Sequence, residues 1–143
     1  MICVNELKMT LDSKSVNEGF ARVAVSAFVA SLDPNIEELT DIKTAVSEAV
    51  TNCVVHGYAE KEGKIYITVS IFEKDFILIK ISDKGVGIEN VERALEPLFT
   101  TAGGDRAGLG FAVMESFMDK VRVKSAPDKG TTVVLEKRIR GKK

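Results

Sequence analysis

Two β-rich runs separated by only three residues are the feature that most restricts the folds open to this chain. In residues 64–72 isoleucine and valine occupy every second position, and residues 76–82 form a second run of the same kind. A connection this short joins neighbouring antiparallel strands, whereas parallel strands need a crossover of roughly a dozen residues or more. We therefore predict an antiparallel hairpin over residues 64–82.

Helical and β patterns follow one another along the chain in an order that excludes a doubly wound parallel sheet, in which strands and helices alternate strictly. The observed order is strand, helix, helix, strand, strand, loop, helix, strand, strand. We predict an α+β fold, a two-layer sandwich with a mixed, mostly antiparallel sheet covered on one face by three helices. Besides the hairpin, the expected elements are a strand at 7–11, a helix that opens at Ser15, a helix over 36–56, a helix over 111–120, and strands at 121–125 and 131–138.

Local signals predict the ends and faces of the helices. Ser15 and Glu18 have the spacing of a capping box at the start of the first helix. Gly57 predicts a left-handed terminator for the second helix. Residues 90–107 are expected to be irregular, with a short helix before Pro97. We expect the first helix to bury an apolar face made of Val16, Phe20, Val23, Ala24, Ala27 and Phe28.

Length and composition predict one domain over residues 1–143 that ends in a short, solvated basic tail at about 137–143. A formal net charge of −1 argues against a nucleic-acid-binding protein. The two cysteines lack metal-ligand spacing, and Cys53 lies on an apolar helix face, so we expect a buried free thiol. The first residues lack the pattern of a signal peptide, and we expect a cytoplasmic protein.

Glu48, Asn52 and His56 form the most informative polar pattern, at four-residue spacing within the second expected helix. Four residues advance an α-helix by slightly more than one turn, so the three side chains share one face. Apolar residues between them continue a stripe that faces the core. The row provides a possible base and a possible metal ligand, although polar residues also border the apolar face of any amphipathic helix.

Asp83, Gly85 and Gly87 form a second pattern, an acid at a strand end followed by a Gly-x-Gly turn. Glycines at this spacing allow a tight turn and close approach of the backbone to a ligand. The segment is not a dinucleotide-binding fingerprint, because no third glycine follows and no helix starts at once. Alone, it is equally typical of a plain glycine-rich loop.

Gly108 and Gly110 form the third pattern, at the expected start of the helix over 111–120. Free backbone amides and the helix dipole favour phosphate at such a position, and the structural alternative is a helix that packs tightly through small residues. All three patterns occur once, in order and at suitable spacing. That combination is far more specific than any one of them.

The combined set resembles the N, G1 and G2 boxes of the GHKL (Bergerat-fold) ATPases. Within that superfamily the chain resembles the sporulation anti-sigma-F factors, which are serine kinases. The resemblance covers nearly the whole chain. The further segments that carry it are residues 18–23, 27–34, 47–58, 97–101 and 129–133.

The resemblance implies a site for ATP and Mg²⁺. Asn52 would be the single protein ligand of Mg²⁺, which takes its other ligands from water and the triphosphate. Glu48 would act as the catalytic base toward an attacking hydroxyl. Asp83 would accept a hydrogen bond from the adenine amino group. The other implied pocket residues are Gly85, Gly87, Gly108 and Gly110, with Thr132 behind Asp83.

The resemblance also implies an ATP lid over residues 100–107. Thr100 and Thr101 would begin it, and Arg106 would contact the γ-phosphate, although Arg106 fits a solvated loop charge equally well. The chain departs from the family at residues 102–104, where Ala-Gly-Gly replaces a more structured Lys-Pro-type segment.

In this family the kinase binds a sigma factor of RNA polymerase and phosphorylates a serine on an anti-anti-sigma protein. The resemblance puts Glu18 and Arg22 on the partner-binding surface and the first strand in a homodimer; the structural alternative is an ordinary surface ion pair. Two other functions stay open, the ATP-binding catalytic domain of a histidine kinase and a non-catalytic ATP-dependent sigma-binding module. A chaperone or topoisomerase-type ATPase is disfavoured, because the chain lacks a transducer domain.

Overall fold

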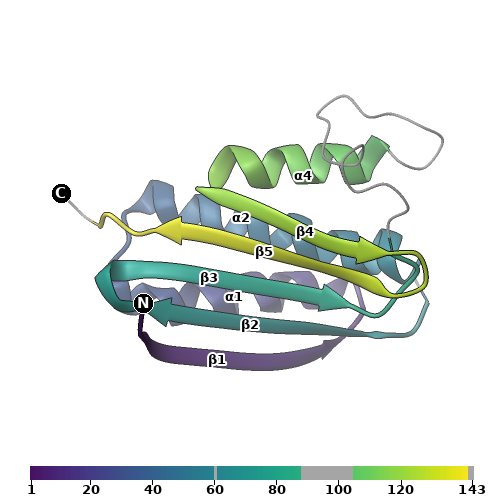
Figure 1. Cartoon of the computed structure of the whole chain (residues 1–143), viewed down its shortest axis with the longest axis horizontal. Coiled ribbons are helices and arrows are strands. Elements are labelled where there is room, and N and C mark those ends of the chain that lie inside the picture. Colours follow the sequence, from purple (N-terminus) through teal and green to yellow (C-terminus); the bar gives the residue numbers. More distant parts are fainter. Residues whose placement is uncertain (60, 88–104, 142–143) are drawn as a thin grey trace.

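The computed structural model describes residues 1–59, 61–87 and 105–141, with residues 105–109 as backbone only. The segment 88–104, which includes the helix expected before Pro97, lies outside these residues. Figure 1 shows the arrangement of the elements. They are β1 (Cys3–Asp12), α1 (Val16–Val29), a 3-10 turn (Ala30–Leu32), α2 (Ile36–Asn52), a π-helical turn (Cys53–Gly57), β2 (Lys64–Phe72), a 3-10 turn (Glu73–Asp75), β3 (Phe76–Asp83), α4 (Asp105–Phe117), β4 (Lys120–Ala126) and β5 (Gly130–Arg138).

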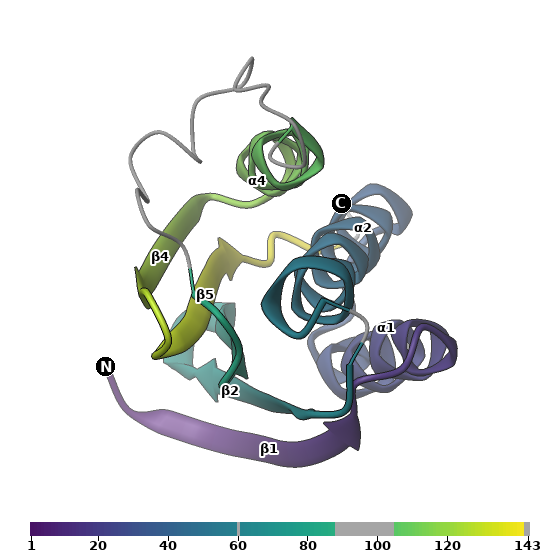
Figure 2. The same cartoon turned by 90° about the vertical axis from the view of Figure 1, so that its right-hand side faces the viewer.

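The five strands form one sheet in the order β1-β2-β3-β5-β4. Both predicted hairpins, β2-β3 and β4-β5, are confirmed. Every pairing between the described strands is antiparallel, so the parallel part of the expected mixed sheet is wrong. In Figure 2, α1, α2 and α4 lie on the same side of the sheet, which confirms the two-layer sandwich.

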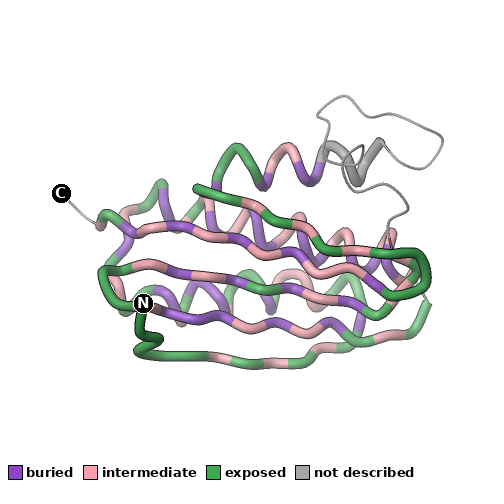
Figure 3. The backbone as a smooth tube through the Cα atoms, viewed as in Figure 1, coloured by how far each residue is buried: buried purple, intermediate pink, exposed green. Residues whose placement is uncertain are grey.

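The core lies between the sheet and the helices α1, α2 and α4, and its strand residues form rows across the sheet (Figure 3). Because side chains alternate along a strand, cross-strand partners share a face. One row runs through Met9, Ile67, Ile81, Val133 and Val123, each aligned with the next. The period-two pattern of the sequence therefore determined the buried face of the sheet.

The α1 helix does not bury the face predicted for it. Val16, Phe20 and Val23 are 78%, 58% and 59% exposed, so that part of the prediction is wrong. The helix instead packs through small and medium residues, Ala21, Val25, Ser26 and Val29. Small side chains at a helix contact let the two helices approach closely, and the larger residues then remain outside. No helix in the described part of the chain is long and apolar enough to cross a membrane.

A capping box is present at α2 and not at α1. The Asn35 side chain accepts a hydrogen bond from the Glu38 amide (2.7 Å), and the Glu38 carboxylate accepts one from the Asn35 amide (3.0 Å). Within the described residues Ser15 makes no side-chain capping hydrogen bond, so the predicted box is wrong. The carboxylate of Glu18 is instead used in a contact with Ser47.

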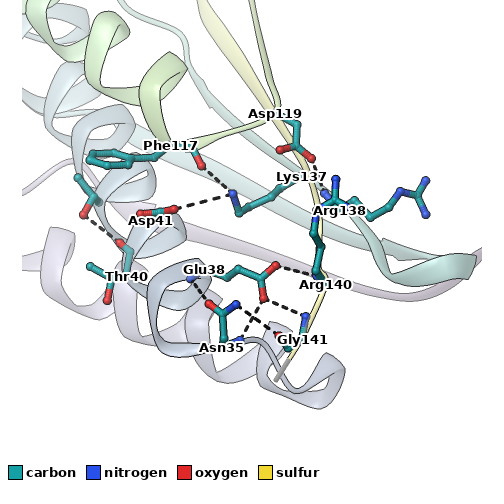
Figure 4. Close-up of polar contacts among 11 residues, drawn as sticks. Asn35, Glu38, Thr40, Asp41, Phe117, Asp119, Lys137, Arg138, Arg140 and Gly141 are labelled. Atoms are coloured by element: carbon teal, nitrogen blue, oxygen red, sulfur yellow. Dashed lines mark hydrogen bonds and ion pairs between the residues drawn. The ribbon is translucent and has the colours of Figure 1, made fainter. Parts of the chain in front are cut away.

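Residues 137–141 are anchored and are not a solvated tail, contrary to the prediction (Figure 4). The Glu38 carboxylate also accepts hydrogen bonds from the amides of Arg140 (2.7 Å) and Gly141 (3.1 Å). Lys137 is 9% exposed, and its ammonium group donates to the Phe117 carbonyl at the end of α4 (2.9 Å). The end of β5 therefore holds together the start of α2 and the end of α4.

Candidate functional site

Asp83 ends β3 on the face of the sheet that the helices cover. It follows Ile79 and Ile81 on that face, and only 6% of it is exposed. Its Oδ1 atom accepts hydrogen bonds from the amides of Gly85 (2.9 Å) and Thr131 (3.2 Å). The backbone therefore fixes one oxygen of a buried carboxylate at the end of an apolar strand face.

The burial of Asp83 changes the pKa of its carboxyl group. Burial raises the pKa of the Asp83 carboxyl, and hydrogen bonds from the Gly85 amide, the Cys53 thiol and the Thr131 amide offset the effect only in part. Burial and the adjacent Asp83 carboxylate also raise the pKa of the Cys53 thiol, which therefore stays protonated. The prediction that Cys53 is a buried free thiol is confirmed.

Glycines bring the neighbouring backbone against this carboxylate. A Cβ atom added at Gly57 would lie 2.6 Å from Oδ2 of Asp83, and one at Gly85 would lie 1.9 Å from the Gly57 carbonyl oxygen. Gly87 has a φ of +76°, a backbone conformation that residues with a side chain rarely adopt. Gly57 does not have a positive φ, so the predicted left-handed terminator is wrong. Glycine is needed at position 57 because Asp83 leaves no room for a side chain.

The α2 helix ends at Asn52 and continues as the π-helical turn, whereas the sequence predicted one α-helix to His56. The Tyr58 amide donates to the Cys53 carbonyl (2.9 Å), the hydrogen bond that widens this turn. Short π-helical turns are rare and are found frequently at functional sites. His56 lies within this turn and lines a cavity together with Asn52.

A narrow cavity joins the end of α2 to Asp83. Its volume is about 40 Å³, whereas pockets for drug-sized ligands measure roughly 300–1,000 Å³. Phe111 of α4 forms part of the wall. Asn52 and Asp83, which come from different elements, open onto this same cavity, as the proposed site requires. The lining residues are Ala49, Asn52, Cys53, His56, Gly57, Ile81, Asp83, Gly87, Phe111, Thr131 and Val133.

Gly110 of α4 packs against the polar side of α2. An added Cβ atom there would lie 3.2 Å from both the Asn52 amide nitrogen and Oε2 of Glu48. The side-chain amide nitrogen of Asn52 is buried and has no hydrogen-bond partner among the described residues. Buried polar groups are nearly always paired, so an unpaired amide at a cavity fits a group that binds a ligand.

The start of α4 differs from the prediction. The helix begins at Asp105, so Gly108 and Gly110 lie inside it and not at its first residues. The predicted helix start at these glycines is therefore wrong, whereas their role in the nucleotide pocket stays a prediction. Thr100 and Thr101 of the expected lid lie outside the described residues, and Arg106 is described only as backbone.

Thr131, and not Thr132, lies beside Asp83. The Thr132 hydroxyl is on the opposite face of the sheet, 3.0 Å from the Ser82 hydroxyl, so its expected place behind Asp83 is wrong. Val133 and Leu135 are buried, and the period of two assigns Thr131 to their face. The sequence therefore contained the signal for Thr131.

Glu18 and Arg22 form the ion pair that their spacing suggested, with 3.2 Å between Oε2 and Nε. Their side chains are 30% and 45% exposed, so both are accessible to another molecule. The same Glu18 oxygen accepts a hydrogen bond from the Ser47 hydroxyl of α2 (2.7 Å). Sequence reasoning missed Ser47, because no spacing rule predicts a contact between residues on different helices.

Comparisons with known proteins identify the class of domain and then the family. Residues 10–137 match the family described as "Histidine kinase-like ATPase domain". An anti-sigma F factor of Clostridium perfringens (strain ATCC 13124) is 54% identical over 136 residues, 94% of this chain and 97% of that protein. One from Clostridium novyi (strain NT) is 51% identical over 138 residues, 95% of this chain and 96% of that protein. The chain therefore belongs to the histidine kinase-like ATPase domain family and, within it, to the anti-sigma F factors.

Solved structures support the same fold. A Mycobacterium tuberculosis structure with RsbU and RsbW domains matches with a TM-score of 0.69 and 21% identity, over 95% of this chain and 32% of that one. The histidine kinase domain of a blue-light activated kinase from Erythrobacter litoralis matches with a TM-score of 0.55 and 16% identity, over 85% of this chain and 61% of that one. The chain thus spans about a third of the mycobacterial chain. These likenesses show the fold, and with the family match they confirm the resemblance predicted from the three motifs.

Proposed function

We propose that this chain is an anti-sigma factor that also acts as an ATP- and Mg²⁺-dependent protein serine kinase. The observation that supports the nucleotide site is the cavity onto which both Asn52 and Asp83 open. The names of the relatives, anti-sigma F factors, point to a sporulation sigma F factor as the bound partner. The proposed substrate is a serine hydroxyl of an anti-anti-sigma protein.

Asp83 is suited to recognise the adenine amino group. Its carboxylate is fixed by two backbone amides in dry surroundings. Such an acceptor discriminates against ligands that present no donor, because it would then stay unpaired. Ile81 and Val133, which are cross-strand neighbours, supply an apolar wall of the cavity. The cavity of about 40 Å³ is smaller than the usual size of a ligand pocket, so we expect its lining residues to shift when a purine binds.

Asn52 is suited to hold a Mg²⁺ ion that arrives with the triphosphate. Among the described residues no group of three or more His, Cys, Asp and Glu could hold a metal. A nucleotide-bound Mg²⁺ ion needs few protein ligands, because water and phosphate oxygens complete its octahedron. The side-chain carbonyl oxygen of Asn52 would provide one such ligand, and the unpaired amide nitrogen beside it is a donor suited to a phosphate oxygen. When bound there, the ion would neutralise charge on the phosphates.

Glu48 is the proposed general base. It lies one helical turn before Asn52 and, like Asn52, faces Gly110. It does not line the narrow cavity itself, which suits a group that faces the phosphate end of the nucleotide and not the base. From there its carboxylate would accept the proton of the attacking serine hydroxyl, a role worth roughly 10²- to 10⁴-fold in rate.

The partner and dimer surfaces are proposed on other elements. Glu18 and Arg22 on α1 are accessible and would contact the protein partners. β1 is an edge strand, and Val4 within it is exposed, as are Met1 and Ile2 just before it. Edge strands present unpaired backbone groups to another chain, which supports a homodimer through β1. Sedimentation at several protein concentrations tests this, and a monomer at all of them contradicts it.

Phosphoryl transfer from γ-labelled ATP to an anti-anti-sigma protein tests the proposed activity. We expect an acid-stable phosphoprotein, which indicates phosphoserine. An acid-labile product would favour the histidine-kinase alternative. ATP-dependent sigma binding without any transfer would favour the non-catalytic module.

The variant Glu48→Gln separates binding from chemistry. It should leave ATP affinity nearly intact and slow transfer by about 10²-fold or more, because the amide cannot accept the hydroxyl proton. Glu37→Gln is the matched control, an exposed glutamate on the same helix that should change neither quantity. Transfer at the wild-type rate in Glu48→Gln would show that the base is another group.

A further inference from the structure

Ser47 forms a polar contact between α1 and α2 that the proposed site does not use. Its hydroxyl donates to Oε2 of Glu18 over 2.7 Å, in a partly buried position. The acceptor is a carboxylate oxygen, so the hydrogen bond is of the strong, charge-assisted kind. The same oxygen lies 3.2 Å from Nε of Arg22. A single carboxylate therefore connects an accessible arginine on α1 to the middle of α2.

Other hydroxyls on the helices behave differently. The hydroxyls of Ser26, Thr44 and Ser116 donate to backbone carbonyls of their own helices, at 2.9 Å in each case. That local bond is the usual choice for serine and threonine inside a helix. Ser47 instead donates its proton to another element, and the contact therefore depends on how α1 and α2 are placed.

The position of Ser47 along α2 gives this contact a consequence. Ser47 directly precedes Glu48, the proposed base, in the chain, and Asn52 follows within the same helix. An α-helix moves largely as a rigid element, so a displacement at Ser47 is passed to both residues. Gly110 packs against Glu48 and Asn52 so closely that an added Cβ would lie 3.2 Å from each. Small shifts of α2 therefore change the geometry of the site.

We propose that Ser47 is a positioning residue that couples the Glu18–Arg22 surface to Glu48 and Asn52. A protein that contacts Arg22 or Glu18 competes for the carboxylate that holds Ser47 and so biases the placement of α2. By linkage, a nucleotide bound at Asn52 changes the affinity for that protein by the same factor. The inference rests on the proposed function, because it takes α1 as the surface that contacts the sigma factor.

The test measures the dissociation constant of the full chain for a sigma F factor, with and without Mg·ATP. The ratio of the two constants is the coupling between the sites, and allosteric ratios are roughly 5- to 150-fold. We expect Mg·ATP to change sigma affinity in the wild type, and Ser47→Ala to bring the ratio at least about fivefold closer to one. A loss of packing alone would change the melting temperature and both constants together, but not their ratio.

Matched variants complete the experiment. Thr44→Ala removes a hydroxyl that bonds only within α2, and it should keep the wild-type ratio. Ser47→Thr keeps the donor and should also keep the ratio. Ser47→Cys replaces the hydroxyl with a weak donor and should bring the ratio closer to one, which tests the inference even if Ser47→Ala does not fold. An equal ratio in wild type, Ser47→Ala and Ser47→Cys, or no effect of Mg·ATP in the wild type, overturns the inference. A chain that does not bind the sigma factor at all contradicts the proposed function instead.

Discussion

Replacement of Gly110 by alanine should separate stability from activity. Gly110 is buried inside α4 and faces the two polar residues of α2 proposed to act on the nucleotide. The added Cβ would lie 3.2 Å from Oε2 of Glu48, 3.2 Å from Nδ2 of Asn52 and 3.3 Å from Oδ1 of Asn52. These contacts are tighter than ordinary van der Waals separation, so the two side chains must shift by a few tenths of an ångström.

The two effects of this substitution have opposite signs. Alanine is favoured over glycine in a helix interior by about 0.5–1 kcal/mol, a gain in the free energy of unfolding from which the cost of shifting Glu48 and Asn52 is subtracted. Mg²⁺ requires near-ideal octahedral geometry at roughly 2.0–2.1 Å, so a displaced Asn52 amide is a poorer ligand. The loss of one well-placed hydrogen bond or ligand corresponds to about 1–2 kcal/mol, or roughly 5- to 30-fold in affinity for Mg·ATP.

Calorimetric titration with Mg·ATP and thermal melting of the free protein measure the two quantities on one sample. Gly19→Ala in α1 is the matched control, because its Cβ would meet only Nη2 of Arg22 at 3.6 Å, an ordinary contact. That control should gain comparable stability and keep its nucleotide affinity. Wild-type affinity for Mg·ATP in Gly110→Ala would refute the placement of the phosphate end of the site between α2 and α4.

Two further predictions concern buried carboxylates. Asp83→Asn should weaken ATP binding by a few kcal/mol, since a donor amide would face the adenine amino group. The same variant should stabilise the free protein. The folded-state pKa of Asp83 is raised above its ordinary 3.8, so ionisation of the wild-type carboxyl destabilises the fold as pH rises through that pKa. Denaturant titrations should show that gain at neutral pH and not below pH 3.8, and no gain at neutral pH would contradict the argument. Glu38→Gln should lower stability at neutral pH by about 1–2 kcal/mol, through the weakened hydrogen bonds to the Arg140 and Gly141 amides. Burial alone would raise the pKa of Glu38, but these amides, that of Asn35 and the charge of Lys137 hold the pKa below its ordinary 4.5. The difference in the free energy of unfolding between wild type and variant should therefore be complete above pH 4.5 and disappear as pH falls through the lower folded-state pKa. A difference independent of pH would show that the charge is not involved.

The sequence alone determined the elements and the order in which they occur. The period of two in residues 64–72 and 76–82 and the three-residue connection between them require an antiparallel hairpin, whatever surrounds it. Two of the three motifs were local patterns that the structure confirms, since Asn52 lies in a helix and Asp83 lies at the end of a strand, although α2 ends at Asn52 and not at His56. Asp83 and Asn52 had therefore been identified before their convergence on one cavity was visible.

The tertiary structure decided what depends on contacts between elements. α1 carries two candidate faces, and only its packing on α2 chose the one with small residues and left Phe20 in solvent. Gly57 is required by the carboxylate of Asp83 and Gly110 by Glu48 and Asn52, residues that are neighbours only in space. The hydrogen bond between Ser47 and Glu18 likewise joins residues that are distant in the chain and neighbours only in space. Periodicity and turn chemistry act over a few residues, whereas these choices arise where helices and strands distant in the chain compete for the same volume.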